Sequence, residues 1–176
     1  TRIDEVRTMV KEAIEVLSSN KCFNEVEARN LMNYIFDGKA TESQIGAVLM
    51  AYRLKGTTSE ELAGFAKSMM DKATKIKSKH KICIDTCGTG GDKKGTFNIS
   101  TAAAFIVAGA GIPVAKHGNR SVSSKSGSAD VLETFGVKID IAPKEMENCL
   151  NDIGIAFLFS PLLHKSMKNV MPARKD

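Results

Sequence analysis

Apolar residues recur every three or four positions along the first seventy or so residues of the chain. This spacing places them on one face of each helix and the charged residues on the other faces. Capping signals divide the pattern into four helices, because NEVE at 24–27, TESQ at 41–44 and TSEE at 58–61 each place Glu or Gln three residues after Asn or Thr. Gly38 and Gly56 end the second and third helices. The pattern therefore predicts a helical domain over residues 1–72.

From residue 73 onward, short apolar runs alternate with helical segments, which predicts an α/β domain over residues 73–176. Such a domain has a parallel sheet covered by helices. Ligands of these sheets bind at the carboxyl ends of the strands, where two polar loops of this chain are expected. The runs that predict strands are ICIDTC at 82–87, IPVAK at 112–116, VKIDI at 137–141 and IAFLFS at 155–160.

Several large apolar side chains on the predicted helices are difficult to bury within so small a unit. Packing against the rest of the chain explains them, and so does a subunit interface, because exposed apolar patches commonly mark one. The sequence leaves both explanations open. The side chains are Met50, Tyr52, Phe65, Met69 and Met70.

Composition and charge limit the partners of the chain. Its 176 residues are 43% apolar and carry a formal net charge of +5, with the lysines spread along the sequence. This distribution disfavours nucleic-acid binding. The longest apolar run, at 102–114, is too short and too rich in glycine to span a membrane. We expect a soluble cytoplasmic protein.

The cysteines and histidines follow no zinc-binding spacing, so we expect free thiols in a reducing compartment. These residues are Cys22, Cys83, Cys87 and Cys149, with His80, His117 and His164.

The first polar loop lies in DTCGTGGDKKGTFNIST at 85–101, which contains four glycines. Glycines let the backbone turn tightly and bring amide hydrogens close to a ligand. Asn98, Ser100 and Thr101 stand at the start of the next predicted helix, where amide dipoles attract phosphate. The loop matches neither the Walker nor the dinucleotide fingerprint. It predicts an anion site, although glycine turns with such caps also occur as simple connections.

The second loop, HGNRSVSSKSGS at 117–128, adds cations and hydroxyl groups. Lys116 and Arg120 can neutralise a phosphate, and Asn119 can both donate and accept hydrogen bonds. A serine-rich loop is often only mobile surface, but its place one βα unit after the glycine loop favours a diphosphate-bearing substrate. His117 is a possible general base without a matched acid in the sequence. This inventory favours a site that acts by positioning and charge stabilisation.

Five segments give the chain a specific resemblance to the anthranilate phosphoribosyltransferase family of tryptophan biosynthesis. They are GTGGD at 88–92, TFNIST at 96–101, KHGNR at 116–120, SGSADVLE at 126–133 and FLFSPLLHKSMKNVMPAR at 157–174. The resemblance implies a helical dimer-forming domain followed by part of a parallel-sheet α/β domain of the nucleoside phosphorylase/phosphoribosyltransferase type. It also implies transfer of the phosphoribosyl group of phosphoribosyl pyrophosphate to the amino group of anthranilate, with Mg²⁺ present.

The resemblance assigns substrate contacts residue by residue and implies no acid or base among them. Ser100 matches a Mg²⁺ contact, and Gly88, Asn119 and Arg174 match anthranilate contacts. The guanidinium of Arg174 suits the carboxylate of that substrate. The positions that match contacts to phosphoribosyl pyrophosphate are Gly88, Gly91, Asp92, Thr96, Asn98, Ile99, Ser100, Thr101, Lys116, His117, Gly118, Asn119, Arg120, Ser121, Val122, Ser123, Ser124 and Ser128.

The chain departs from the family in its length. Family members continue through more sheet and an adjacent Asp-Glu pair that binds Mg²⁺, whereas no such pair occurs in the second half of this sequence. We therefore expect an amino-terminal piece with weak or no activity, an expectation that robust turnover would refute. Two other functions stay open: a pyrimidine nucleoside phosphorylase, which releases a free pyrimidine in a phosphate-dependent reaction, and a nucleic-acid-binding relative, whose retention on DNA or RNA falls with salt.

Overall fold

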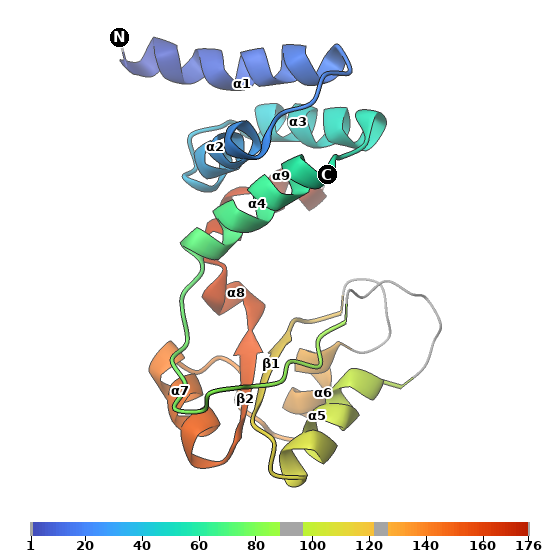
Figure 1. Ribbon diagram of the computed structural model, residues 1–176, viewed down its shortest axis with the longest axis vertical. Coiled ribbons are helices and arrows are strands. Elements are labelled where there is room, and N and C mark those ends of the chain that lie inside the picture. The colour runs from blue at the N-terminus through green and yellow to red at the C-terminus, as the bar shows by residue number, and fades with distance from the viewer. Residues whose placement is uncertain (1, 89–96, 122–126, 176) are drawn as a thin grey trace. The chain divides into compact units, whose positions relative to one another are not determined.

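A computed structural model describes residues 2–88, 97–121 and 127–175 (Figure 1). They form two units that each have their own core. One unit consists of Thr1–Ala73 with His164–Asp176, and the other is Thr74–Leu163. The predicted combination of an amino-terminal helical part with a following α/β part is confirmed. The expected domain ranges, 1–72 and 73–176, stay a prediction.

The first unit contains the four predicted helices, and local capping determines where three of them begin. Asn24, Thr41 and Thr58 each accept a hydrogen bond from the backbone amide three residues later, and the Glu or Gln at that position bonds back to the cap amide. The helices are α1 (Arg2–Ser18), α2 (Glu25–Phe36), α3 (Glu42–Lys55) and α4 (Ser59–Lys72).

Segments from the two ends of the sequence share the core of this helical unit. The 3-10 helix η1 (Lys165–Asn169) and α9 (Met171–Lys175) return to the helices, and Val170 between them is buried in the same cluster as residues of α1, α2 and α3. The side-chain amide of Asn169 donates to the carbonyl of Phe36 over 2.8 Å. The last part of the chain therefore stabilises the helical unit.

The contact between α2 and α4 depends on a glycine. A Cβ atom at Gly64 would lie 2.5 Å from the carbonyl oxygen of Glu25 and 2.9 Å from the Cβ of Ala28, so the two helices would have to separate. We expect Gly64→Ala to lower the free energy of unfolding by about 1–3 kcal/mol. Urea denaturation followed by tyrosine fluorescence measures this, because the only two tyrosines, Tyr34 and Tyr52, lie in this unit and the chain has no tryptophan.

The matched control is Gly46→Ala in α3, where no atom lies within 4 Å of the added Cβ. Alanine is a better helix former than glycine, so this change should raise the free energy of unfolding by about 0.5–1 kcal/mol. Equal effects of the two substitutions would contradict the packing argument.

The second unit is built on two parallel strands, β1 (Val114–Gly118) and β2 (Ile155–Phe159). Val114 pairs with Ile155, and the register continues to Gly118 opposite Phe159. In Figure 1, α7 lies beside β2, whereas α5 and α6 lie on the side of β1. The helices of this unit are α5 (Ile99–Gly109), α6 (Ser128–Thr134), α7 (Pro143–Asp152) and the short α8 (Ser160–Leu163).

Two of the four predicted strands differ in the structure. The segment 82–87 forms a single isolated parallel bridge, between Ile84 and Val114, in place of a full strand. The segment 137–141 is irregular, although Ile139 is buried against Ala129 and Leu132 of α6. A strand requires a neighbour that accepts its backbone hydrogen bonds, and the apolar pattern reports burial without reporting that neighbour.

No helix in the part of the chain that the structure describes is long and apolar enough to cross a membrane.

Candidate functional site

The parallel pairing brings the starts of both polar loops to one end of the small sheet. Residues 85–88 follow the bridge at Ile84, and residues 119–121 follow β1. Residues 97 and 98 lead into α5, and Thr86 Oγ1 donates to the carbonyl of Ser100 over 2.7 Å. Three separate segments of the chain therefore converge at the carboxyl ends of the strands, as expected for this fold class.

Lys116 is a buried cation at the centre of this arrangement. Burial alternates along β1, so Val114, Lys116 and Gly118 face inward, and Lys116 is only 3% exposed. Its ammonium nitrogen lies 3.2 Å from Thr86 Oγ1 and 3.3 Å from Ser100 Oγ. Both contacts are neutral hydroxyls, and none of the ion pairs among the described residues includes Lys116.

Burial lowers the pKa of Lys116 below its ordinary value, and the more distant Cys87 and Asp85 only partly oppose this effect. An ammonium ion without a negative partner is costly to bury. An anionic ligand beside it would remove part of that cost.

The first turn of α5 presents further polar groups. The side-chain oxygen of Asn98 accepts from the Thr101 amide and from Ser100 Oγ, each over 3.1 Å. Thr101 is 2% exposed, and its hydroxyl has no hydrogen-bond partner within the described ranges. Buried hydroxyls normally have partners, so this oxygen can serve a ligand.

Asp85 supplies an acid for His117 that the sequence pattern does not reveal. Its Oδ2 lies 2.9 Å from His117 Nδ1, and its Oδ1 accepts from the amides of Cys87 (2.8 Å) and His117 (3.2 Å). The expectation that His117 has no matched acid is therefore wrong. The two residues are 32 positions apart, and the parallel bridge at Ile84 brings them together.

Thr86 is a second residue of the site that the sequence pattern does not reveal. Its hydroxyl donates to Ser100 and accepts from Lys116. Asp85 and Thr86 both stand within the glycine-rich stretch, but their side-chain types alone give no sign of these long-range contacts.

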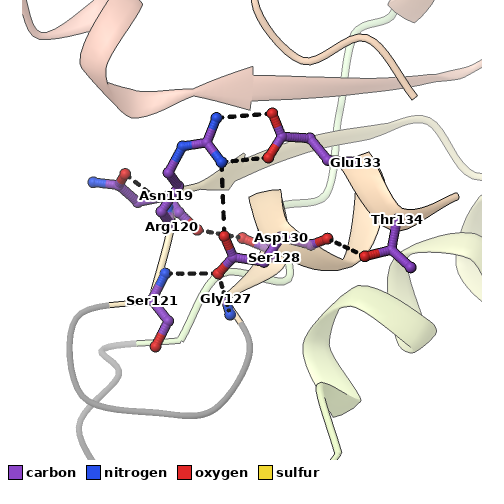
Figure 2. A network of polar contacts seen from close by, with 8 residues as sticks. All are labelled: Asn119, Arg120, Ser121, Gly127, Ser128, Asp130, Glu133 and Thr134. Carbon is purple, nitrogen blue, oxygen red and sulfur yellow. Dashed lines mark hydrogen bonds and ion pairs between the residues drawn. The ribbon is translucent and has the colours of Figure 1, made fainter. Parts of the chain in front are cut away.

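Arg120 has carboxylate partners in the structure. Figure 2 shows its guanidinium facing Glu133, with Nη2 donating to Oε1 over 2.8 Å and Nη1 bonded to Oε2. The same Nη1 lies 3.8 Å from Asp130 Oδ1. The charge of Arg120 is therefore already compensated, which leaves the buried Lys116 as the stronger candidate for an anion.

Asp130 joins the two ends of the segment that runs from Ser121 to Gly127 (Figure 2). Its Oδ2 accepts from the amides of Ser121 (2.9 Å) and Gly127 (2.8 Å). These two amides lower the pKa of Asp130. Asp130 lies in the first turn of α6.

Close packing requires a glycine at the end of β1. A Cβ at Gly118 would lie 2.2 Å from Ser128 Oγ and 2.4 Å from the ring of Phe157. The carbonyl of Asn119 then accepts from the Ala129 amide over 3.2 Å, so the second loop is attached to α6.

The remaining predicted site residues divide into three groups. Gly88 ends the described part of the first loop, and Ile99 is exposed in α5. Arg174 is exposed in α9, in the helical unit. Six positions lie outside the described residues: Gly91, Asp92, Thr96, Val122, Ser123 and Ser124.

The described residues include no group of three or more His, Cys, Asp or Glu side chains that could hold a metal ion. Ser100, the predicted Mg²⁺ contact, has the Lys116 ammonium 3.3 Å from its oxygen. Like charges repel, so a cation fits beside Ser100 only together with an anion that supplies most of its oxygen ligands.

Both parts of the chain match models of one protein family. Residues 80–176 match the glycosyl transferase family, a/b domain, and residues 11–73 match the glycosyl transferase family, helical bundle domain. An anthranilate phosphoribosyltransferase from Pelotomaculum thermopropionicum is 56% identical over 168 residues, which are 96% of this chain and 49% of that protein. The chain spans about half the length of the curated relatives of this name that it matches.

Two solved structures have the same fold over nearly the whole chain. Anthranilate phosphoribosyltransferase from Thermus thermophilus superposes with a TM-score of 0.85 at 35% identity, over 93% of this chain and 50% of that one. The enzyme from Saccharomyces cerevisiae, solved in complex with PRPP and Mg, gives 0.85 at 24% identity, over 96% of this chain and 51% of that one.

Proposed function

Because the chain belongs to this glycosyl transferase family, we propose that it binds phosphoribosyl pyrophosphate and transfers the phosphoribosyl group to the amino group of anthranilate, with weak turnover by this chain. Pyrophosphate is the leaving group, and the reaction belongs to tryptophan biosynthesis. The relatives named anthranilate phosphoribosyltransferase support this choice of substrates.

The buried ammonium of Lys116 is the observation that carries the proposal. It lies among two hydroxyls, beside the first turn of α5, with no carboxylate paired to it among the described residues. A diphosphate supplies the missing negative charge and accepts a charge-assisted hydrogen bond from the ammonium. The amide dipoles at the start of α5 add further stabilisation to an anion at this position.

The mechanism follows from where charge develops. As the bond between the ribose C1 and pyrophosphate breaks, negative charge grows on the departing diphosphate, and Lys116 and the α5 amides stabilise it there. The amino group of anthranilate is a neutral nucleophile, so no strong base is needed to activate it. We assign Gly88, Asn119 and Arg174 to the binding of anthranilate.

We propose that Mg²⁺ binds together with the diphosphate. When bound, Mg²⁺ supplies further charge neutralisation for the leaving group. Ser100 would contribute one oxygen, while the diphosphate and water contribute the others. The Saccharomyces cerevisiae structure with PRPP and Mg is in accord with such a pair.

Release of pyrophosphate from phosphoribosyl pyrophosphate, measured with and without anthranilate, tests the proposed reaction. We expect release that requires anthranilate, with the arylamine consumed in equal amount. Release that is independent of anthranilate, or release that requires inorganic phosphate and a nucleoside, would contradict the proposal. The double substitution Asn98→Ala and Lys116→Ala serves as the inactive reference.

We also propose a homodimer through the helical unit. Leu54 is 81% exposed, and Val26, Leu62 and Met70 are each more than 60% exposed. Solvent exposure of so many large apolar side chains is unfavourable, and a second copy would cover them. Sedimentation equilibrium should give a dimer for the parent chain and a monomer for Leu54→Glu, whereas a monomeric parent would contradict the proposal.

The cytoplasm is the compartment that we propose for this protein. Its four cysteines, at positions 22, 83, 87 and 149, are free thiols in the structure. Thiols persist in a reducing compartment.

A further inference from the structure

The side chain of Asp85 contacts both loops that frame the candidate site. One carboxylate oxygen, Oδ1, accepts from the amide of Cys87 in the first loop and from the amide of His117 at the end of β1. The other oxygen, Oδ2, lies 2.9 Å from His117 Nδ1. The two backbone contacts of Oδ1 are enough for a residue that only stabilises a turn. The contact of Oδ2 with the imidazole therefore needs a separate explanation.

The contact of Oδ2 selects one tautomer of the imidazole. An ionised carboxylate only accepts hydrogen bonds, so Nδ1 must carry the proton that it donates to Asp85. In the neutral ring, Nε2 then carries the lone pair and acts as an acceptor. The side chains of Asp85 and His117 are 37% and 41% exposed, so a ligand can reach the imidazole.

Asp85 and its neighbour Thr86 hold two consecutive residues of β1. Asp85 binds His117, while Thr86 accepts from the ammonium of Lys116 over 3.2 Å. Side chains alternate along a strand, so Lys116 and His117 point to opposite sides of β1. Asp85 and Thr86 therefore determine the positions of the His117 imidazole and the Lys116 ammonium at this end of the sheet.

We propose that Asp85 is a positioning residue, which fixes His117 in the tautomer protonated at Nδ1 and ties the start of the glycine loop to the end of β1. Its catalytic consequence rests on the proposed function, in which His117 contacts phosphoribosyl pyrophosphate. Its structural part stands on the three contacts of the carboxylate alone.

Two substitutions separate the two parts of this role. In Asp85→Asn, Oδ1 can still accept from the two amides, which keeps the side chain in its present orientation. The new amide nitrogen replaces Oδ2 and can only donate, so His117 Nδ1 must become the acceptor and the proton must move to Nε2. Asp85→Ala removes the contacts to the backbone as well. The exposed Asp152 at the end of α7 provides the control Asp152→Asn.

Nitrogen-15 NMR of the histidine rings tests the tautomer directly, without any ligand. The spectra are recorded where the imidazoles are neutral, and His117→Gln identifies the signals of His117 among the three histidines. We expect a proton on Nδ1 in the parent chain and in Asp152→Asn, and a proton on Nε2 in Asp85→Asn. A proton on Nε2 in the parent chain, or the same tautomer in the parent and Asp85→Asn, would overturn the proposal.

Binding and turnover then test the consequence. We expect Asp85→Asn to bind phosphoribosyl pyrophosphate within about threefold of the parent chain, while its turnover at saturating substrate falls at least about tenfold because the tautomer is wrong. Asp85→Ala should lose at least about tenfold in binding as well, because the loop is no longer anchored. Unchanged turnover in Asp85→Asn would overturn the catalytic part. A parent chain that binds no phosphoribosyl pyrophosphate would refute the proposed function and leave the NMR result standing.

Discussion

Replacing Lys116 with methionine should weaken the binding of phosphoribosyl pyrophosphate by about 30-fold to 100-fold without destabilising the fold. Methionine has similar length and lacks the ammonium group. The lost contact is a hydrogen bond between charged groups, which contributes about 2–3 kcal/mol to binding. Calorimetric titration measures the change in affinity.

The same substitution should raise the free energy of unfolding of the α/β unit by up to about 2 kcal/mol. It removes a buried charge that has no carboxylate partner among the described residues. Thr86 and Ser100 still donate to the Ser100 carbonyl and to Asn98, so the hydroxyls left behind keep a partner. Urea denaturation followed by circular dichroism, compared with tyrosine fluorescence of the helical unit, measures this gain. The exposed Lys138 gives the control Lys138→Met, which should change neither property.

The pH dependence of stability provides a signature of Lys116. Burial lowers the pKa of the folded state below the ordinary value of 10.5. At pH values between the lowered pKa of the folded state and 10.5, Lys116 binds a proton in the unfolded chain but not in the folded chain. The free energy of unfolding should therefore rise with pH across this window. Lys116→Met should lack this rise. A loss of stability in Lys116→Met with unchanged binding would contradict the assignment of Lys116 to the anion.

Replacing Glu61 with alanine should produce the largest loss of stability in the helical unit, about 3–5 kcal/mol. Glu61 is fully buried and accepts from the amides of Phe23 (3.0 Å) and Thr58 (2.9 Å) and from the Lys55 ammonium (2.9 Å). The Lys55 side chain is only 5% exposed, so the substitution leaves a buried cation and two amides without their acceptor. Urea denaturation followed by tyrosine fluorescence measures the effect.

Two further variants separate the contributions at Glu61. Glu61→Gln keeps an acceptor oxygen and removes the charge, so it should lose about 1–3 kcal/mol. The neighbouring Glu60 is exposed, and Glu60→Ala should stay within about 0.5 kcal/mol of the parent. Similar losses from Glu60→Ala and Glu61→Ala would contradict the buried network.

Acid should weaken the helical unit through the same carboxylate. Burial alone raises the pKa of Glu61, but the amides of Thr58 and Phe23 and the Lys55 ammonium together hold it below its ordinary value of 4.5. A carboxylate with a depressed pKa stabilises the fold above 4.5 and loses that contribution as the pH falls through the lower, folded-state pKa. In Glu61→Gln, the free energy of unfolding should fall less steeply with pH over this acid range.

The sequence predicted the features that depend on neighbours along the chain. The capping boxes at Asn24, Thr41 and Thr58 are local, so the starts of three helices followed from residues three positions apart. The strands β1 and β2 were predicted for a similar reason, because their apolar runs are short and bounded by turn residues. The strand expected at 137–141 is irregular, because pairing depends on a partner strand that the local pattern does not report.

The features that the sequence did not predict are contacts between distant residues. The pairing of Asp85 with His117, the contact of Thr86 with Lys116 and the return of Val170 to the helical core each need the folded chain. The role of Arg120 was also incomplete from sequence, because its pairing with Glu133 depends on how α6 follows the second loop. The residue types of the anion site were visible in the sequence, whereas the absence of a carboxylate paired with Lys116 among the described residues required the structure.

Calorimetric titration of the chain with phosphoribosyl pyrophosphate and Mg²⁺ tests the central claim most directly. We predict saturable binding of one substrate per chain, at least about 100-fold weaker when Asn98→Ala and Lys116→Ala are combined, because two polar contacts are then lost. Mg²⁺ alone should give no binding heat at the same concentration. No binding by the folded parent chain, or equal binding by the parent and the double variant, would contradict the claim that Lys116 and the first turn of α5 hold the diphosphate.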